Sequence, residues 1–225
     1  MILKNAAAAR VWHFVTALVV TLAVIGQLYL LFANVAVGFE ETAAPLHRRL
    51  VEFFSYFTIQ SNILVAITTG MLAVNPERSG LLWRVLRLAS LFGITVTLVI
   101  YHVVLARLAN FEGLAAATNV GLHYVAPILA IVGWFLFGPR PRFTARTLLW
   151  AACWPAAYLV YTLVHGAFSG FYPYPFVNVD KRGLGHVLVT AVGLVAVLLA
   201  IGAVYVLLDK VLAPKSSRSR SSLSP

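Results

Sequence analysis

The stretch VLVTAVGLVAVLLAIGAVYVLL, residues 187–208, contains no charged side chain. At about 1.5 Å per residue, a helix of this length crosses the roughly 30 Å hydrocarbon core of a bilayer. Similar apolar blocks recur along the 225-residue chain, of which 61% is hydrophobic and 11% is charged. Because a soluble domain carries about 25% charged residues, this composition excludes a soluble globular protein. The single cysteine, Cys153, excludes an intrachain disulfide.

The apolar blocks predict an all-α fold, a bundle of six transmembrane helices. This membrane domain covers residues 1–212, and its spans are predicted at residues 11–33, 50–74, 85–106, 119–138, 147–168 and 185–208. Residues 213–225, which include KSSRSRSSLSP, are predicted to form a disordered, basic tail. No connecting segment is long enough for a soluble domain, so any chemistry is expected within the bilayer or at its edge.

The Lys and Arg residues are distributed unevenly between the two sides of the membrane. Six crossings place both termini on one side, and that side receives twelve of the 17 basic residues. By the positive-inside rule, both termini are predicted to be cytoplasmic. The net charge of +10 follows this distribution, so it indicates contact with membrane lipids and not binding of nucleic acid. The oligomeric state stays open.

Polar side chains concentrate in the outer halves of the predicted spans. Residues Ser55, Thr58 and Asn62 follow helical spacing, and four histidines on other spans lie within roughly 10 Å of the outer boundary. Lipid cannot satisfy such groups, so we expect them to face inward around one polar chamber. Besides Thr58 and His123, the chamber is expected to include Ser55, Ser61, Asn62, His102, Asn119, Tyr124, Tyr161, Thr162, His165 and His186. The inner halves of the second, fourth and sixth spans are almost purely apolar, which argues against simple helix packing as the reason for this asymmetry.

Within the chamber, Thr58 and His123 share one depth, so contact between the two side chains is geometrically possible. A neutral imidazole can take the proton of a hydroxyl group and make it nucleophilic. Pro127 removes the N–H partner of the His123 carbonyl, so a kink is expected beside this histidine. Glu52 is predicted near the outer surface, so no carboxylate is expected to orient His123, and Asn119 is the available polar substitute.

An acyl-transfer reaction also needs donors for the oxyanion that forms. Because backbone N–H groups inside a helix are already hydrogen-bonded, side chains are expected to supply them. The candidate donors are Asn62, Tyr101, Tyr124 and Tyr161. A site at this depth favours an amphiphilic small-molecule substrate whose chain stays in lipid. The loop FSGFYPYPF, residues 168–176, is interpreted either as a lid or as an aromatic belt at the membrane interface.

Two histidines fall outside this predicted chamber. His13 is expected at the cytoplasmic interface beside Trp12. His47, together with Arg48 and Arg49, is expected to contact lipid headgroups.

Three stretches resemble a known family. FFSYFTIQSNILVAI (53–67), GLHYVAPILAIVGWFLF (121–137) and YLVYTLVHGAFSGFYPYPFVNV (158–179) resemble the bacterial six-span membrane proteins of the Pr-six-Pr type. That family is distantly similar to the androgen-induced membrane proteins, which hydrolyse fatty acid esters of hydroxy fatty acids with a threonine and a histidine. The resemblance implies that these residues are Thr58 and His123, and it favours a bacterial plasma membrane as the location.

Two alternatives remain open from the sequence. The hydrolase needs no cofactor, but His102, His123, His165 and His186 could instead hold zinc or haem. The chain could also be a non-enzymatic transporter or membrane scaffold, although it shows no clear repeats and no span broken at its middle by Gly and Pro.

Overall fold

The computed structural model describes residues 5–35 and 44–214, and this part of the chain is helical without any β-strand. Six helical segments are long and apolar enough to cross a membrane. They are α1 (Ala6–Phe32), α3 (Phe57–Val74), α4 with its extension (Leu81–Leu108), α5 with α6 (Gly113–Phe137), α7 (Ala145–Ser169) and α9 (Leu184–Val211). The chain is therefore a multi-pass membrane protein of the predicted fold class. Lys4, one of the basic residues counted on the side of the termini, lies outside the described residues. Residues 215–225 of the predicted tail lie outside them as well.

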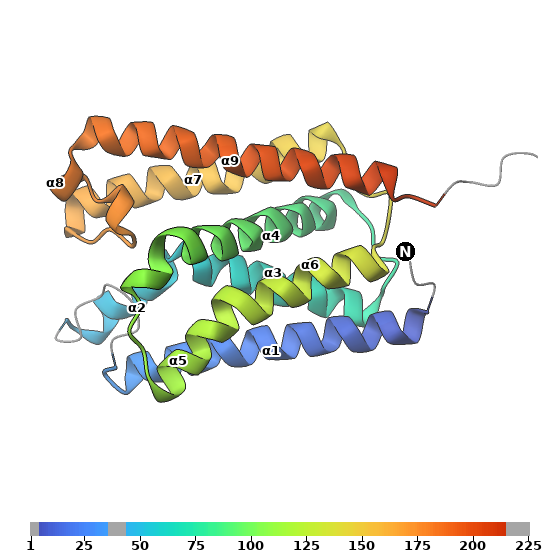
Figure 1. Cartoon of the computed structure of the whole chain (residues 1–225), viewed down its shortest axis with the longest axis horizontal. Helices are drawn as coiled ribbons and strands as arrows, with labels where there is room; N and C mark the ends of the chain where they lie inside the picture. The colour runs from blue at the N-terminus through green and yellow to red at the C-terminus, as the bar shows by residue number, and fades with distance from the viewer. Residues whose placement is uncertain (1–4, 36–43, 215–225) are drawn as a thin grey trace, which may run out of the picture.

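The six long segments run side by side in one bundle (Figure 1). Helix α4 lies at its centre and contacts α3, α6, α7 and α9. Helices α7 and α9 pack together on one side of α4, and α1, α3 and α6 pack on the other (Figure 1). The first and last described residues lie at the same end of the bundle, here called the termini end, as six crossings require. The short helices α2 (Leu46–Ser55) and α8 (Val179–Arg182) lie at the opposite end (Figure 1).

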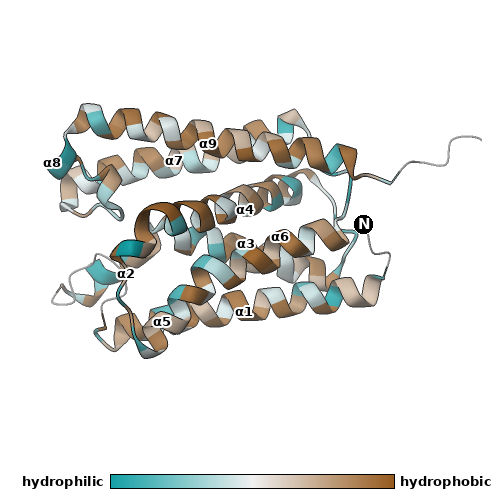
Figure 2. Ribbon diagram, viewed as in Figure 1, coloured by the Kyte–Doolittle hydropathy of each residue, from teal (hydrophilic) through white to brown (hydrophobic). Residues whose placement is uncertain are grey.

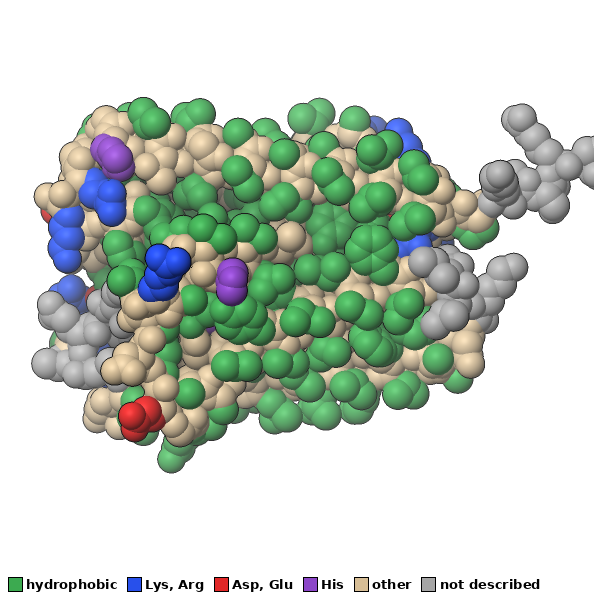
Figure 3. Space-filling view, in the orientation of Figure 1, with side chains coloured by type: hydrophobic (Ala, Val, Ile, Leu, Met, Phe, Trp, Pro, Cys, Tyr) green, Lys and Arg blue, Asp and Glu red, His purple; other side chains and the backbone are tan. Residues whose placement is uncertain are grey.

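The surface of the bundle has the character of a membrane protein. Hydrophobic residues dominate the long helices (Figure 2), and hydrophobic side chains cover the middle of the face in Figure 3. Lys and Arg side chains on that face lie towards its two ends (Figure 3). Large apolar residues such as Phe168, Val189 and Leu149 are mostly exposed. These side chains are suited to contact with lipid, because hydrocarbon does not penalise exposed apolar groups.

The predicted span 50–74 is not one continuous helix. At Tyr56 the backbone is extended, with φ −74° and ψ 126°, so α2 ends at Ser55 and α3 begins at Phe57. The spacing predicted that Ser55 and Thr58 share one helical face. This prediction is wrong, because the two residues belong to different helices. The interruption makes Thr58 the second residue of α3, and this position matters for its chemistry.

Two π-helical turns interrupt the spans near the same end of the bundle. One, Tyr101–Leu105, follows α4 (Leu81–Ile100) and leads into a short 3-10 turn, Ala106–Leu108. The other, Gly121–Val125, joins α5 (Gly113–Val120) to α6 (Ala126–Phe137), and there the Ala126 N–H donates to the Gly121 carbonyl. The second turn contains His123 and lies just before Pro127, where the sequence predicts a distortion.

The half of the bundle nearest the termini also contains buried polar side chains, outside the apolar stretches predicted on the second, fourth and sixth spans. Arg87 of α4 is only 1% exposed and donates to the Thr68 hydroxyl of α3. His13 of α1 is buried inside the bundle against Phe137. Asp209 of α9 is also buried. Polar burial is therefore not confined to one half of the bundle, and the predicted asymmetry does not by itself identify a functional chamber.

Two charged residues of α2 lie at the opposite end of the bundle, and both are buried. Arg49 donates to the side chain of Asn34 and to the Leu31 carbonyl, so it ties α2 to the end of α1 and does not face headgroups as predicted. Glu52 lies at the end where the sequence placed it, but it is only 1% exposed and pairs with Arg48 at 2.8 Å. Both residues are buried because α2 folds across the bundle end instead of continuing α3.

Candidate functional site

The structure brings the two predicted catalytic side chains together. The Thr58 Oγ1 atom on α3 lies 3.4 Å from the Nε2 atom of His123 in the π-helical turn. Thr58 is 7% exposed. This distance is at the long end for a hydrogen bond, which is common for catalytic pairs in the absence of substrate. The contact joins residues 65 positions apart in the chain, so it depends on how α3 packs against the π-helical turn.

The orientation of the His123 ring follows from its other contacts. Its Nδ1 atom lies 3.0 Å from the carbonyl oxygen of Asn119, one turn earlier. A carbonyl oxygen only accepts hydrogen bonds, so Nδ1 carries the hydrogen in the neutral ring. Nε2 is then an acceptor and faces the Thr58 hydroxyl. The sequence assigned this orienting role to the Asn119 side chain, whose amide instead donates to the Tyr101 hydroxyl at 2.5 Å.

A tyrosine from the loop after α7 completes the immediate surroundings of Thr58. The Tyr174 hydroxyl lies 3.1 Å from the Thr58 backbone nitrogen and 3.3 Å from Thr58 Oγ1. Its ring packs edge-on against Tyr56 and stacks on Phe176. Burial raises the pKa of Tyr174, so the hydroxyl keeps its proton at neutral pH. Sequence reasoning missed this residue, although it singled out the aromatic loop 168–176 that contains it.

The break at Tyr56 also changes which backbone donors are available. Thr58 lies in the first turn of α3, where backbone N–H groups have no partner within the helix. Its N–H donates to the Tyr174 oxygen. The sequence predicted that this N–H is hydrogen-bonded within its helix, whereas it is engaged by Tyr174. The start of α3 also directs the positive end of the helix dipole towards the site.

Two cavities meet at Thr58. One, of about 230 Å³, is partly polar and is lined by residues that include Gln27, Asn119 and His123. The other, of about 100 Å³, is largely apolar and lies between α4, α7 and α9. Both cavities are lined by Thr58, Tyr101, Leu105 and Tyr174. The Thr58 side chain is thus accessible from a polar space on one side and an apolar space on the other.

The other predicted residues of α3 and α7 have different positions. Asn62 donates to the carbonyls of Thr58 at 2.8 Å and Leu122 at 3.2 Å, so it braces α3 against the turn that carries His123. Ser61 faces α4, where its Oγ would lie 3.1 Å from a Cβ placed on Gly93. Thr162 lines the apolar cavity. None of these three contacts His123.

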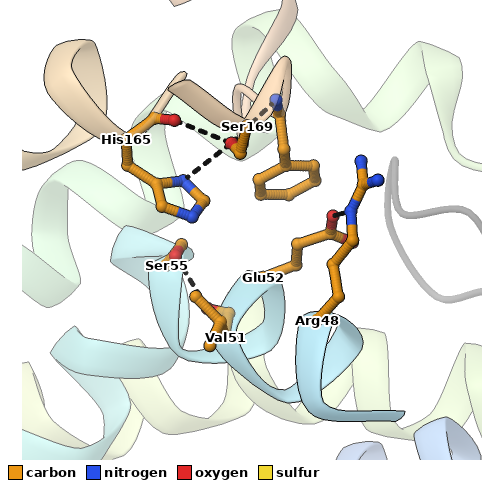
Figure 4. Close-up of polar contacts among 7 residues, drawn as sticks. Arg48, Val51, Glu52, Ser55, His165 and Ser169 are labelled. Atoms are coloured by element: carbon orange, nitrogen blue, oxygen red, sulfur yellow. Dashed lines mark hydrogen bonds and ion pairs between the residues drawn. The ribbon is translucent and has the colours of Figure 1, made fainter. Parts of the chain in front are cut away.

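A second polar group forms between α2 and α7, apart from Thr58. The Ser55 hydroxyl lies 2.6 Å from the Tyr161 hydroxyl, and the Tyr161 ring stacks on His165 at 5.3 Å. Figure 4 shows His165 and Ser169 of α7 across from Ser55 and Glu52 of α2. The Ser169 hydroxyl donates to the His165 carbonyl at 2.7 Å. The predicted single chamber is therefore divided, and these residues belong to its second part.

The predicted histidines do not converge. His102 is exposed, and its Nδ1 atom lies 3.2 Å from the Tyr124 hydroxyl. His186, near the start of α9, is also exposed, and its Nε2 atom lies 3.4 Å from the guanidinium of Arg182 in α8. Within residues 5–35 and 44–214, no group of three or more His, Cys, Asp or Glu side chains is arranged to hold a metal ion. The alternative of zinc or haem held by several histidines therefore has no geometric support.

Comparisons of this chain with protein-family models, with curated protein sequences and with solved structures return no match.

Proposed function

We propose that the chain is a membrane-embedded hydrolase of lipid esters, with Thr58 as the nucleophile and His123 as the general base. The observation that carries this proposal is the contact of 3.4 Å between Thr58 Oγ1 and His123 Nε2. It gains weight from the Asn119 carbonyl, which leaves Nε2 as the basic nitrogen. A buried threonine used only for helix packing has no need of an imidazole oriented in this way.

The reaction would proceed in two acyl-transfer steps. Thr58 Oγ1 attacks the ester carbonyl carbon while its proton passes to His123 Nε2. The tetrahedral intermediate then expels the alcohol, which takes the proton from His123, and the acyl group stays on Thr58. Water, deprotonated by His123, attacks this acyl ester. The free acid leaves, and the proton returns to the Thr58 oxygen.

Tyr174 is proposed to stabilise the negative charge on the carbonyl oxygen. Its hydroxyl accepts from the Thr58 N–H, and its own hydrogen, which can be donated to Thr58 Oγ1 at 3.3 Å, would be donated to the carbonyl oxygen of a bound substrate. The raised pKa of Tyr174 favours the protonated form that this role requires. Preorganised donors of this kind contribute strongly to acyl transfer in sites shielded from water.

The broader assignments are proposals as well. We propose that the chain belongs to the Pr-six-Pr type family, on the stretches at 53–67, 121–137 and 158–179. We further propose that the termini are cytoplasmic and that the membrane is a bacterial plasma membrane. The distribution of Lys and Arg supports the orientation. The site would then face the outer leaflet, where an amphiphilic lipid ester is available.

The proposal is tested by measuring the release of fatty acid from lipid esters by purified protein. Wild type is expected to hydrolyse at least one ester, and Thr58→Ala is expected to abolish this activity. Thr58→Ser keeps a hydroxyl and should retain part of it. Thr69→Ala is the matched control, because Thr69 is a buried threonine of α3 whose hydroxyl donates to carbonyls of its own helix, at Val65 and Ala66. Equal activity of Thr58→Ala and wild type would refute the proposal.

A further inference from the structure

We propose that the apolar cavity between α4, α7 and α9 binds the acyl chain of the substrate, and that Leu198 on its far wall, across from Thr58, limits the length of that chain. This inference rests on the proposed ester hydrolysis for the position of the reacting group. It adds a binding site, a ligand class and a residue that determines specificity.

The cavity extends from Thr58 on α3 across the bundle to α9. Helices α4 and α9 run in opposite directions, and each lines the cavity over about two turns or more. On α4 the lining residues extend from Leu105 to Val96, and on α9 from Ala191 to Leu198. At 1.5 Å per residue these stretches measure roughly 10 to 13 Å along the helices. The cavity is therefore elongated along the bundle, as a site for an extended chain would be.

The position of Leu198 relative to Thr58 follows from the two helices that carry them. Thr58 of α3 lines the cavity at the proposed reaction, and Leu198 of α9 lines its far wall. Both helices end at the termini end of the bundle. Thr58 lies 16 residues before Val74, the last residue of α3, and Leu198 lies 13 residues before Val211, the last residue of α9. The two residues are therefore at similar depths, and Leu198 lies across the cavity from Thr58.

The chemistry of the wall selects hydrocarbon. Among the described residues that line the cavity, none carries a charge, and their polar atoms are threonine and tyrosine hydroxyls. A sugar or an ion placed here would lose hydrogen bonds to water without replacing them. An alkyl chain has no such cost and gains from leaving water. The partly polar cavity on the other side of Thr58, with Asn119 and His123, is left for the alcohol part of the ester.

Leu198 offers a direct way to change the length of the site. Its side chain is 5% exposed and faces the cavity, whereas the adjacent Val197 is 45% exposed on the outside of α9. Leu198→Phe should fill the far side of the cavity, and Leu198→Ala should extend it. Val197→Phe adds the same ring to the same helix on the other face, so it controls for effects on insertion and folding.

The test measures kcat/KM for a series of p-nitrophenyl esters of increasing acyl length. We expect Leu198→Phe to lower kcat/KM for the longest esters accepted by wild type by about tenfold or more, because a pocket that loses room for methylenes loses that much selectivity. Leu198→Ala should shift the optimum to longer chains, and Val197→Phe should keep the wild-type profile. An unchanged profile in both Leu198 variants, with hydrolysis still dependent on Thr58, would overturn the acyl site.

A binding measurement separates this inference from the proposed function. A bound fluorescent fatty acid is displaced by fatty acids of increasing chain length from wild type, Leu198→Phe and Val197→Phe. This measurement reports binding and does not depend on hydrolysis. Chain-length selectivity that changes only in Leu198→Phe supports the acyl site even if no ester is hydrolysed, in which case the proposed function alone fails. Identical selectivity in all three proteins contradicts the acyl site.

Discussion

The phenol ring of Tyr101 stacks on the imidazole of His123, with ring centroids 3.8 Å apart and planes inclined by 20°. Each residue lies in a π-helical turn, one following α4 and the other preceding α6. Such turns often occur at functional sites, because the extra residue changes the direction of the side chains around it. Together with the Asn119 carbonyl, Tyr101 fixes the plane of the imidazole that faces Thr58.

The first prediction concerns the base. His123→Gln keeps a polar side chain but cannot accept and return the proton of Thr58, so kcat for ester hydrolysis should fall about 100- to 10,000-fold. His186→Gln is the control, because the His186 side chain is exposed and its Nε2 atom lies beside Arg182, not beside Thr58. Steady-state hydrolysis by purified protein provides the measurement. A His123→Gln variant with wild-type kcat would exclude general-base catalysis by this residue.

The second prediction concerns Tyr174. Tyr174→Phe keeps the aromatic packing but removes the proposed oxyanion donor, so kcat should fall about 100- to 1,000-fold with little change in KM. Tyr172→Phe serves as the comparison, since Tyr172 is a buried tyrosine of the same loop that lines neither cavity. If both variants lose the same activity, Tyr174 supports the loop and not the reaction.

The raised pKa of Tyr174 predicts the alkaline limb of the pH profile. The protonated hydroxyl is the active form, and burial holds its pKa above the ordinary tyrosine value of about 10. Activity should therefore persist through pH 9 and fall only above about pH 10, as Tyr174 loses its proton. In Tyr174→Phe the residual activity should lack this fall. A wild-type decline centred well below pH 9 would contradict a role for the Tyr174 proton.

The helices and the set of polar residues could be predicted, because both depend on the contrast between polar and apolar residues. Apolar blocks of about twenty residues form helices in lipid, where every backbone group needs a partner. The choice of Thr58 and His123 within the polar set rests on the resemblance to a known family. The break at Tyr56 could not be predicted, because neither Gly nor Pro marks it. It is tertiary packing that turns α2 across the bundle end and buries Glu52 there.

Tyr174 shows a second reason why sequence reasoning stopped short. A loop residue has no helical register, so its contact with Thr58 depends on the path of the chain after α7. The buried Arg87 shows a third. It lies near the start of α4, where the positive-inside rule counts it as an interfacial charge, but its guanidinium turns inward to Thr68. Charge counting gives the side of the membrane and not the direction of a side chain.

Asp209 should contribute to stability and not to catalysis. Its Oδ2 atom accepts from the backbone nitrogens of Arg142 at 2.5 Å and Phe143 at 2.7 Å, so it ties α9 to the segment before α7. Asp209→Ala leaves these donors without that partner, and the free energy of unfolding should fall by about 1–3 kcal/mol. Thermal unfolding in detergent measures the loss, with exposed Asp180→Ala as control. Hydrolysis per folded molecule should be unchanged in both variants.

The orientation proposal predicts the behaviour of reporter fusions. Green fluorescent protein fused after Pro225 should fluoresce, and alkaline phosphatase at the same place should be inactive, because both reporters would stay in the cytoplasm. Alkaline phosphatase inserted at residue 110, between α4 and α5, should be active. The reverse pattern would show that Thr58 faces the cytoplasmic leaflet.

The most direct test of the account is to find the covalent adduct on Thr58. Membranes with wild type, Thr58→Ala, His123→Gln and Thr69→Ala are treated with a fluorophosphonate probe, and the labelled peptide is identified by mass spectrometry. We predict labelling of wild type and Thr69→Ala at Thr58, and no labelling of Thr58→Ala or His123→Gln. A folded wild type that takes up no probe, or that carries the adduct at another residue, would contradict an activated Thr58.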